Sequence, residues 1–354
     1  MDQWGNPSEH QIGVGFICAV LKDQIVFWGG SQRQPDGNYL TFLNNCMYTF
    51  KLPQPYALNG EWKIVPVSGD LHPGPHSAAA VVCDQTLFIL GGKDGHISNA
   101  TSCLSTLSCD GQFVRKAMGC SIPRLCHQGW SFGSSIFFFA GLSREVDDAR
   151  KQALIPWGED PNNIFVNNDL VQIDPSTGMS RLLSTTGSIP SPRTYFALAQ
   201  IGENIYIHGG YCNRRLGDFY TLNLHTFQWT QIADTGFPGE ICDHTLSKVS
   251  PREILLTGGG LTSGISNQVK LFDVEVGKWR DEAALPVEVS GPNGGLRCHE
   301  AISVPREDGV FVICVGGYCN LKMTEHPTHM ALLEIRCESS FENLRIPPST
   351  KFQS

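Results

Sequence analysis

Two copies of one pentamer place a tyrosine beside a cysteine, a pairing that could serve chemistry. The residues GGYCN occur at positions 209–213 and again at 316–320. A Tyr-Cys pair could form a thioether cofactor or supply metal ligands. Neighbouring side chains on one strand point in opposite directions, so Tyr211 cannot readily reach Cys212. We therefore expect the glycines to serve the fold and the cysteines to be incidental.

No other spacing in the chain predicts a catalytic or metal site. The eleven histidines show neither an H-E-x-x-H motif nor two histidines spaced with a carboxylate, and no CxxC pair occurs. His127, His244 and His299 recur at the start of apolar segments, which favours a structural role. Phosphate-binding loops and G-x-S-x-G elbows are also missing. We predict no catalytic residue, no cofactor and no metal.

Composition points to a globular protein of the cytoplasm or nucleus. The chain has 354 residues, a formal net charge of −8 and an odd number of cysteines, 13. Its first residues, MDQWGNPSEH, lack the basic and apolar regions of a signal peptide, and no apolar run is long enough to span a bilayer. Free thiols fit a reducing compartment. The negative charge argues against nucleic acid as the main partner, and no membrane partner is expected.

A repeat of strand-forming segments must position the residues of any site. Short apolar runs end in Gly-Gly or Ala-Gly six times: IVFWGG, LFILGG, IFFFAG, IYIHGG, ILLTGG and VFVICVGG. The doublets are 62, 49, 69, 49 and 58 residues apart. Each run follows another apolar strand and precedes an alternating one, and an aromatic residue begins the fourth strand: Trp62, Phe113, Trp229, Trp279 and Phe341. Four-stranded units with one apolar face must stack around an axis.

The sequence therefore predicts an all-β protein, a six-bladed β-propeller of four-stranded antiparallel blades. The expected blades are residues 10–70, 71–119, 120–187, 188–236, 237–287 and 288–346. A lead-in of residues 1–9 precedes them, and a tail of residues 347–354 follows. Gly209-Gly210, Tyr220 and Trp229 together resemble a kelch repeat, and the resemblance covers residues 10–346.

A narrower resemblance concerns blades 3 and 4. The insertion at residues 142–165 and the segment RRLGDFYTLNL are similar to the kelch domain-containing substrate receptors of cullin-RING ubiquitin ligases, which bind the C-terminal tails of their targets. The resemblance implies that Arg215 clamps a terminal carboxylate. Tyr211 stands where that family has a second arginine. The eight residues after FENLRI show no apolar box for docking elongin and a cullin.

Topology predicts where a ligand would bind. In an up-and-down blade, the residues before the first strand and those after the Gly-Gly doublet emerge on one face. We call this face the mouth. Arginine pairs two donors with a carboxylate, so the mouth would suit anionic ligands, although acidic residues in the same loops leave simple solvated rim charges as the alternative. The candidate ligand-binding residues are Arg215, Tyr211, Arg193, Arg297, Arg124, Tyr318, Arg144 and Trp157.

The function predicted from these features is a protein- or peptide-binding adaptor. It would capture a C-terminal tail in the mouth and present substrates to a cullin-RING ligase, whose components would then be partners. Two alternatives remain open from sequence. One is a kelch-type small-molecule enzyme similar to sialic-acid mutarotases, using Arg193, Arg215, Arg297 and His244. The other is a scaffold with no ligase link.

Overall fold

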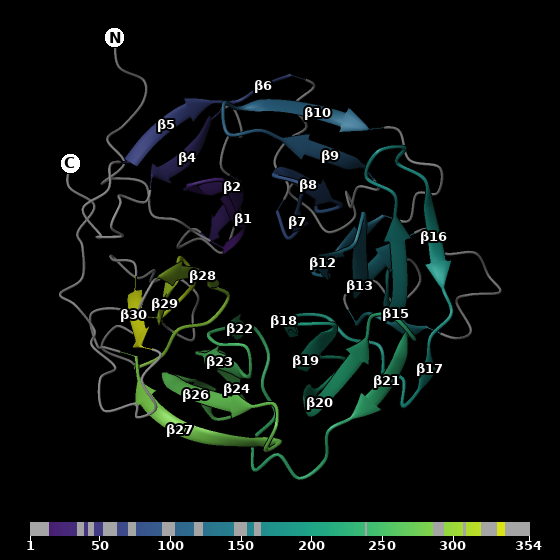
Figure 1. The fold of residues 1–354 in the computed structure, drawn as a ribbon, viewed down its shortest axis with the longest axis vertical. Helices are drawn as coiled ribbons and strands as arrows, with labels where there is room; N and C mark the ends of the chain where they lie inside the picture. The colour runs from purple at the N-terminus through teal and green to yellow at the C-terminus, as the bar shows by residue number, and fades with distance from the viewer. Residues whose placement is uncertain are drawn as a thin grey trace.

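Six antiparallel sheets are arranged as a ring around a central axis (Figure 1). The computed structural model describes residues 14–33, 39–41, 46–51, 62–69, 76–93, 103–116, 123–144, 154–158, 164–237, 239–285, 294–306, 309–319 and 331–336. Each sheet is built from consecutive segments of the chain that run as a meander from the axis outward, and in two sheets a short strand, β6 (Ser68–Gly69) or β17 (Thr186–Gly187), precedes the meander at the outer edge. The predicted six-bladed all-β propeller is therefore confirmed.

The first three blades contain the following strands. Blade 1 has β1 (Val14–Leu21), β2 (Gln24–Arg33), β3 (Tyr39–Thr41), β4 (Cys46–Lys51) and β5 (Trp62–Pro66). Blade 2 has β7 (Ala79–Cys83), β8 (Thr86–Leu90), β9 (Leu104–Leu107) and β10 (Gln112–Lys116), with β6 (Ser68–Gly69) parallel to β10. Blade 3 has β11 (Arg124–Leu125), β12 (Gln128–Phe132), β13 (Ser135–Arg144), β14 (Ile155–Pro156), β15 (Ile164–Ile173) and β16 (Ser180–Leu183).

The last three blades follow the same plan. Blade 4 has β18 (Ala197–Ile201), β19 (Asn204–Tyr211), β20 (Arg215–Asn223) and β21 (Gln228–Gln231), with β17 (Thr186–Gly187) parallel to β21. Blade 5 has β22 (Thr245–Lys248), β23 (Glu253–Thr257), β26 (Gln268–Asp273) and β27 (Lys278–Ala284), and a small hairpin of β24 (Gly260–Leu261) and β25 (Gly264–Ile265). In blade 6 the described strands are β28 (Glu300–Arg306), β29 (Gly309–Val315) and β30 (Ala331–Arg336). The predicted outer-strand residue Phe341 lies outside the described part of the chain.

Hydrophobic packing between adjacent blades closes the ring. Six clusters of buried side chains each join two neighbouring blades. One of them packs Phe16 and Phe27 of blade 1 against Phe311 and Ile313 of blade 6. The innermost strands β1 and β28 also lie side by side. Blades 1 and 6 are thus held together by apolar contact, because burying such side chains removes apolar area from water.

The glycine doublets let each blade approach the next one. Gly209 and Gly210 have positive φ angles of 60° and 106°, a backbone region that favours glycine. A Cβ atom on Gly209 would lie 2.4 Å from the carbonyl oxygen of Ile241, which belongs to blade 5. The amide of Gly210 donates a hydrogen bond to the same oxygen at 2.8 Å. The doublet is therefore part of the joint between blades, as the repeat predicted.

Candidate ligand-binding site

The mouth forms where the turn before each innermost strand meets the segment after the glycine doublet. Isolated bridges pair Thr194 with Tyr211 in blade 4 and Arg297 with Tyr318 in blade 6. The corresponding bridges in blades 2 and 5 are His76 with Lys93 and Cys242 with Gly260. The expectation that these two sets of loops share one face is confirmed.

A belt of six residues, which we call the collar, surrounds the axis at the mouth. Near the start of its innermost strand, each blade has one residue with a φ angle between 53° and 66°, in the left-handed region: Gly15, Ser77, Cys126, Tyr195, Asp243 and Cys298. Backbone hydrogen bonds of 2.8–3.0 Å link consecutive members within blades 1 to 3 and within blades 4 to 6. Between blades 3 and 4, the Thr194 hydroxyl donates instead to the carbonyl of Cys126, at 3.1 Å. The collar fixes the geometry of the mouth.

Collar side chains were not predicted as site residues. Burial raises the pKa of the Cys126 and Cys298 thiols, so both stay protonated. Tyr195 is 36% exposed. Their one sequence signal is position: all but Ser77 stand directly before a histidine or phenylalanine, and Ser77 stands directly after His76.

Three aromatic rings form an exposed corner of the mouth. Strand β14, from the blade 3 insertion, pairs with β15, and the amide of Trp157 donates to the carbonyl of Ile164 at 2.8 Å. The Trp157 ring then contacts Tyr211 edge-on, with centroids 5.7 Å apart, and Tyr195 at 6.4 Å. We call these three residues the aromatic corner. The predicted Trp157 and Tyr211 are thus brought together, and Tyr195 joins them.

Arg215 lies beside this corner. It is half-buried at the start of β20, where its backbone pairs with Tyr211 across β19. Its Nε donates to the carbonyl of Gly260 at 3.1 Å, which directs the guanidinium toward blade 5. No carboxylate among the described residues pairs with it.

Arg297 also reaches the mouth but has a partner. Its side chain is 19% exposed and forms an ion pair with the collar residue Asp243. Arg144 is half-buried at the end of β13, at the mouth end of blade 3. Arg297 therefore differs from Arg215, which has no carboxylate partner among the described residues. Arg144 also interacts with other residues.

Arg124 and Arg193, by contrast, are enclosed and play the same part in two successive blades. The two terminal nitrogens of Arg193 lie 2.8 and 2.9 Å from the carboxylate of Asp218, and one also donates to the carbonyl of Gly209 at 3.0 Å. In blade 3, Arg124 pairs with Asp169 at 3.5 Å and donates to the carbonyl of Ala140 at 2.9 Å. Their side chains are 0% and 1% exposed. Both hold a glycine-doublet corner in place.

Tyr318, predicted as a ligand-binding residue, does not reach the surface of the mouth. It is 1% exposed, so its ring belongs to the interior beneath the mouth. The eight predicted ligand-binding residues therefore fall into a group at the surface of the mouth and a buried group. Arg215, Tyr211, Trp157, Arg297 and Arg144 reach the surface of the mouth, while Arg124, Arg193 and Tyr318 are buried.

The recurring histidines pack between blades. His127, His244 and His299 are at most 5% exposed, and each lies against the first glycine of the preceding blade's doublet. Burial lowers the pKa of His299 to about 3. His244 accepts or donates a 3.1 Å hydrogen bond with His208. The four residues that a mutarotase-like site would need are not gathered in one open pocket, because Arg193 and His244 are enclosed.

No group of three or more histidine, cysteine, aspartate or glutamate side chains within the described ranges could hold a metal ion. The same ranges contain no helix long and apolar enough to cross a membrane.

Comparison with known proteins places the chain in a family. The model for the KLHDC2/KLHL20/DRC7 Kelch-repeats domain matches residues 15–236 and 146–337. Kelch domain-containing protein 2 of Bos taurus is 28% identical over 245 residues, which cover 64% of this chain and 60% of that protein. Host cell factor 2 of Homo sapiens is 26% identical over 280 residues, covering 74% and 32%. Kelch domain-containing protein 10 of Rattus norvegicus is 31% identical over 143 residues, covering 39% and 34%.

The chain thus spans from about a third to 60% of the length of these relatives. The matches support a protein-binding kelch propeller. Since the family model covers most of the chain, the protein belongs to the kelch-repeat family of the KLHDC2/KLHL20/DRC7 type.

Proposed function

We propose that the mouth binds the C-terminal tail of a partner protein, with the terminal carboxylate at Arg215. The observation that carries this proposal is the position of Arg215 beside the aromatic corner, with no carboxylate partner among the described residues. A partly desolvated guanidinium offers two parallel donors to a carboxylate, an arrangement stronger than a neutral hydrogen bond.

The aromatic corner would contact the residues that precede the carboxylate. Trp157, Tyr211 and Tyr195 present ring faces and edges at the rim, and large aromatic residues contribute much of the binding energy where a partner excludes water. The collar supports them with a hydrogen-bonded backbone. An extended peptide fits this arrangement, because a single charge and a short apolar wall recognise a chain end.

Peptide binding with free and amidated C-termini tests the carboxylate. A peptide library displayed in both forms should be bound through its free carboxylates only, and Arg215→Ala should lower that affinity by about tenfold or more. Arg214→Ala is the matched control, because the neighbouring Arg214 is 75% exposed and pairs with Glu240. Equal binding of both peptide forms would sink the proposal.

We further propose that the bound tail marks a substrate for a cullin-RING ubiquitin ligase. This step rests on the resemblance of RRLGDFYTLNL and the blade 3 insertion to such receptors. On this proposal the ligase binds outside the mouth, so affinity purification from cells, followed by mass spectrometry, should recover a cullin and elongin with the wild-type protein and with Arg215→Ala alike. Recovery of tail-bearing partners without any ligase component would leave the protein a binding scaffold.

A further inference from the structure

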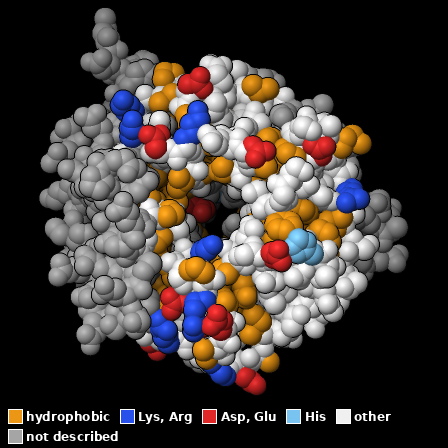
Figure 2. All heavy atoms as spheres, viewed as in Figure 1, with side chains coloured by type: hydrophobic (Ala, Val, Ile, Leu, Met, Phe, Trp, Pro, Cys, Tyr) orange, Lys and Arg blue, Asp and Glu red, His pale blue; other side chains and the backbone are white. Residues whose placement is uncertain are grey.

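A second cavity lies on the axis, deeper than the mouth. It has a volume of about 310 Å³ and is lined by residues of β7, β12, β18, β22 and β28, the innermost strands of five blades. Figure 2 shows the hollow at the centre of the ring from one face. The lining begins three residues after the collar on each strand, which is about 10 Å farther along the axis. It is therefore separate from the aromatic corner and Arg215.

The lining is divided into an apolar layer and a polar layer. Side chains two residues apart on a strand face the same side, so each strand contributes one residue to each layer, and Val81, Trp130, Ala199 and Ser247 complete the lining between the layers. The layer nearer the collar is apolar and consists of Ala80, Gly129, Leu198, Leu246 and Ala301. Farther from the collar, the second layer consists of Val82, Ser131, Gln200, Lys248 and Ser303. The cavity is thus amphipathic along the axis.

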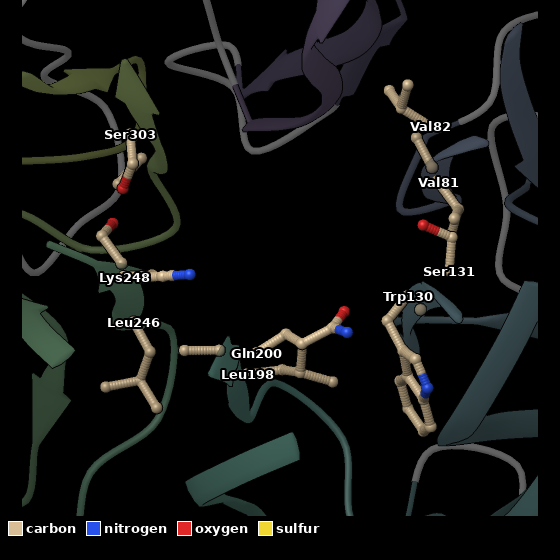
Figure 3. A pocket seen from close by; sticks show the side chains of 14 residues that line it. Val81, Val82, Trp130, Ser131, Leu198, Gln200, Leu246, Lys248 and Ser303 are labelled. Atoms are coloured by element: carbon tan, nitrogen blue, oxygen red, sulfur yellow. The ribbon is translucent and has the colours of Figure 1, made fainter. Parts of the chain in front are cut away.

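Lys248 supplies the charge of the polar layer. Its ammonium group projects into the open centre of the cavity, toward the Gln200 side (Figure 3). Lys248 forms no ion pair with any residue that the structure describes. Glu300, the carboxylate on β28, stands one residue before the lining begins and is not part of it. The polar layer is therefore a cationic site with amide and hydroxyl groups around it.

We propose that this axial cavity binds a small amphipathic carboxylate, with its head group at Lys248 and its hydrocarbon chain on Leu198 and Leu246. The Lys248 ammonium group can donate to the carboxylate, and the Gln200 amide and the hydroxyls of Ser131 and Ser303 add further hydrogen-bond donors to the same layer. The aliphatic layer directly behind them takes apolar atoms out of water. The volume is at the lower end of the range of about 300–1,000 Å³ for small-molecule sites, so a short chain fits better than a lipid.

Calorimetric titration of the intact protein in carboxylate-free buffer tests the site. Hexanoate should bind, its neutral match hexanamide should bind at least about tenfold more weakly, and acetate should be weaker than hexanoate because it lacks the chain. Lys248→Met should weaken hexanoate by about tenfold or more while leaving the melting temperature unchanged. Lys63→Met, an exposed lysine on the outer strand β5, is the matched control and should bind as the wild type does.

Several results would overturn the proposal. They are the absence of hexanoate binding, equal affinity for hexanamide, and equal affinity in Lys248→Met. Inorganic phosphate binding as tightly as hexanoate would show a plain anion site with no use for the apolar layer. Hexanoate binding should survive Arg215→Ala, so failure here and failure of tail binding at the mouth are distinguishable.

Discussion

The two GGYCN pentamers have the same sequence and the same backbone role but opposite surroundings. Both tyrosines follow a left-handed glycine doublet and form an isolated bridge to the turn before their blade's innermost strand. Tyr211 then lies in the aromatic corner against Trp157, partly exposed. Tyr318 is 1% exposed. An identical pentamer fixes the corner of the blade, whereas exposure depends on what other parts of the chain place around it.

The partners that distinguish the two corners come from distant sequence. Trp157 reaches Tyr211 from the blade 3 insertion, through β14. The bridge partner is the small Thr194 in blade 4 and the long Arg297 in blade 6. The cysteines follow the tyrosines: Cys212 is half-buried against the same apolar cluster as Trp157, and Cys319 is 4% exposed. One corner is therefore partly exposed at the mouth and the other is part of the core.

The largest expected difference is in stability. Tyr318→Ala should lower the free energy of unfolding by about 3–5 kcal/mol, because it removes a large buried ring and leaves a cavity. Tyr211→Ala should cost about 1 kcal/mol or less, because its ring is partly exposed and the corner can relax. Urea unfolding of both variants measures the difference. Equal losses would show that the corners are energetically alike despite their different exposure.

The repeat and its blades follow from the sequence because they depend on local periodicity. The six apolar runs that end in a glycine doublet became the second strands of six blades, and the aromatic residues Phe113, Trp229 and Trp279 are buried in the outer strands. The meeting of two loop sets at the mouth follows from strand direction alone. Predicting these features requires only the alternation of apolar and polar residues, the turn-forming residues and the up-and-down order of the strands.

Whether an individual arginine is buried or exposed at the mouth does not follow from the sequence. Arg193 and Arg215 both belong to mouth-forming segments, yet Arg193 is enclosed by Asp218, 25 residues away along the chain. The corresponding pair in blade 3 is Arg124 with Asp169. An Arg before the long second strand with an Asp in the middle of the third strand recurs in both blades, and this pattern could have identified both arginines as internal. Without a known partner, the sequence does not distinguish an arginine that holds the fold together from an arginine that binds a ligand.

A smaller difference between the two blades should appear with pH. At the rung before each doublet, blade 4 pairs Ala197 with His208 and blade 6 pairs Glu300 with Val315. Burial raises the pKa of Glu300 from 4.5 to about 7. The folded protein therefore holds this proton more tightly than the unfolded chain does. The stability that this group contributes is full below pH 4.5 and is lost as pH rises to about 7.

Glu300→Ala, which gives blade 6 the residue of blade 4, should remove that loss. Relative to wild type, the variant should gain about 1–2 kcal/mol of unfolding free energy between pH 4.5 and pH 8, less than the full pKa difference implies because the side chain is partly accessible. Comparing variant with wild type at each pH cancels the titration of the buried histidines. Glu203→Ala, at a residue with a 64% exposed side chain, is the control. If the difference in unfolding free energy between variant and wild type stays the same from pH 4.5 to pH 8, the raised pKa of Glu300 is contradicted.

The smallest expected effect concerns the two cysteines and leaves stability almost untouched. The thiolate is the reactive form of cysteine, and burial raises the pKa of Cys212. Because Cys212 is half-buried whereas Cys319 is enclosed, iodoacetamide should label Cys212 first in the folded protein. Trp157→Ala uncovers Cys212 and should speed its labelling about two- to fivefold, with no change at Cys319. Peptide mass spectrometry over a time course reads both sites in one sample. Acceleration at both cysteines would mean that Trp157 stabilises the whole ring, whereas acceleration at Cys212 alone would show that it covers one corner only.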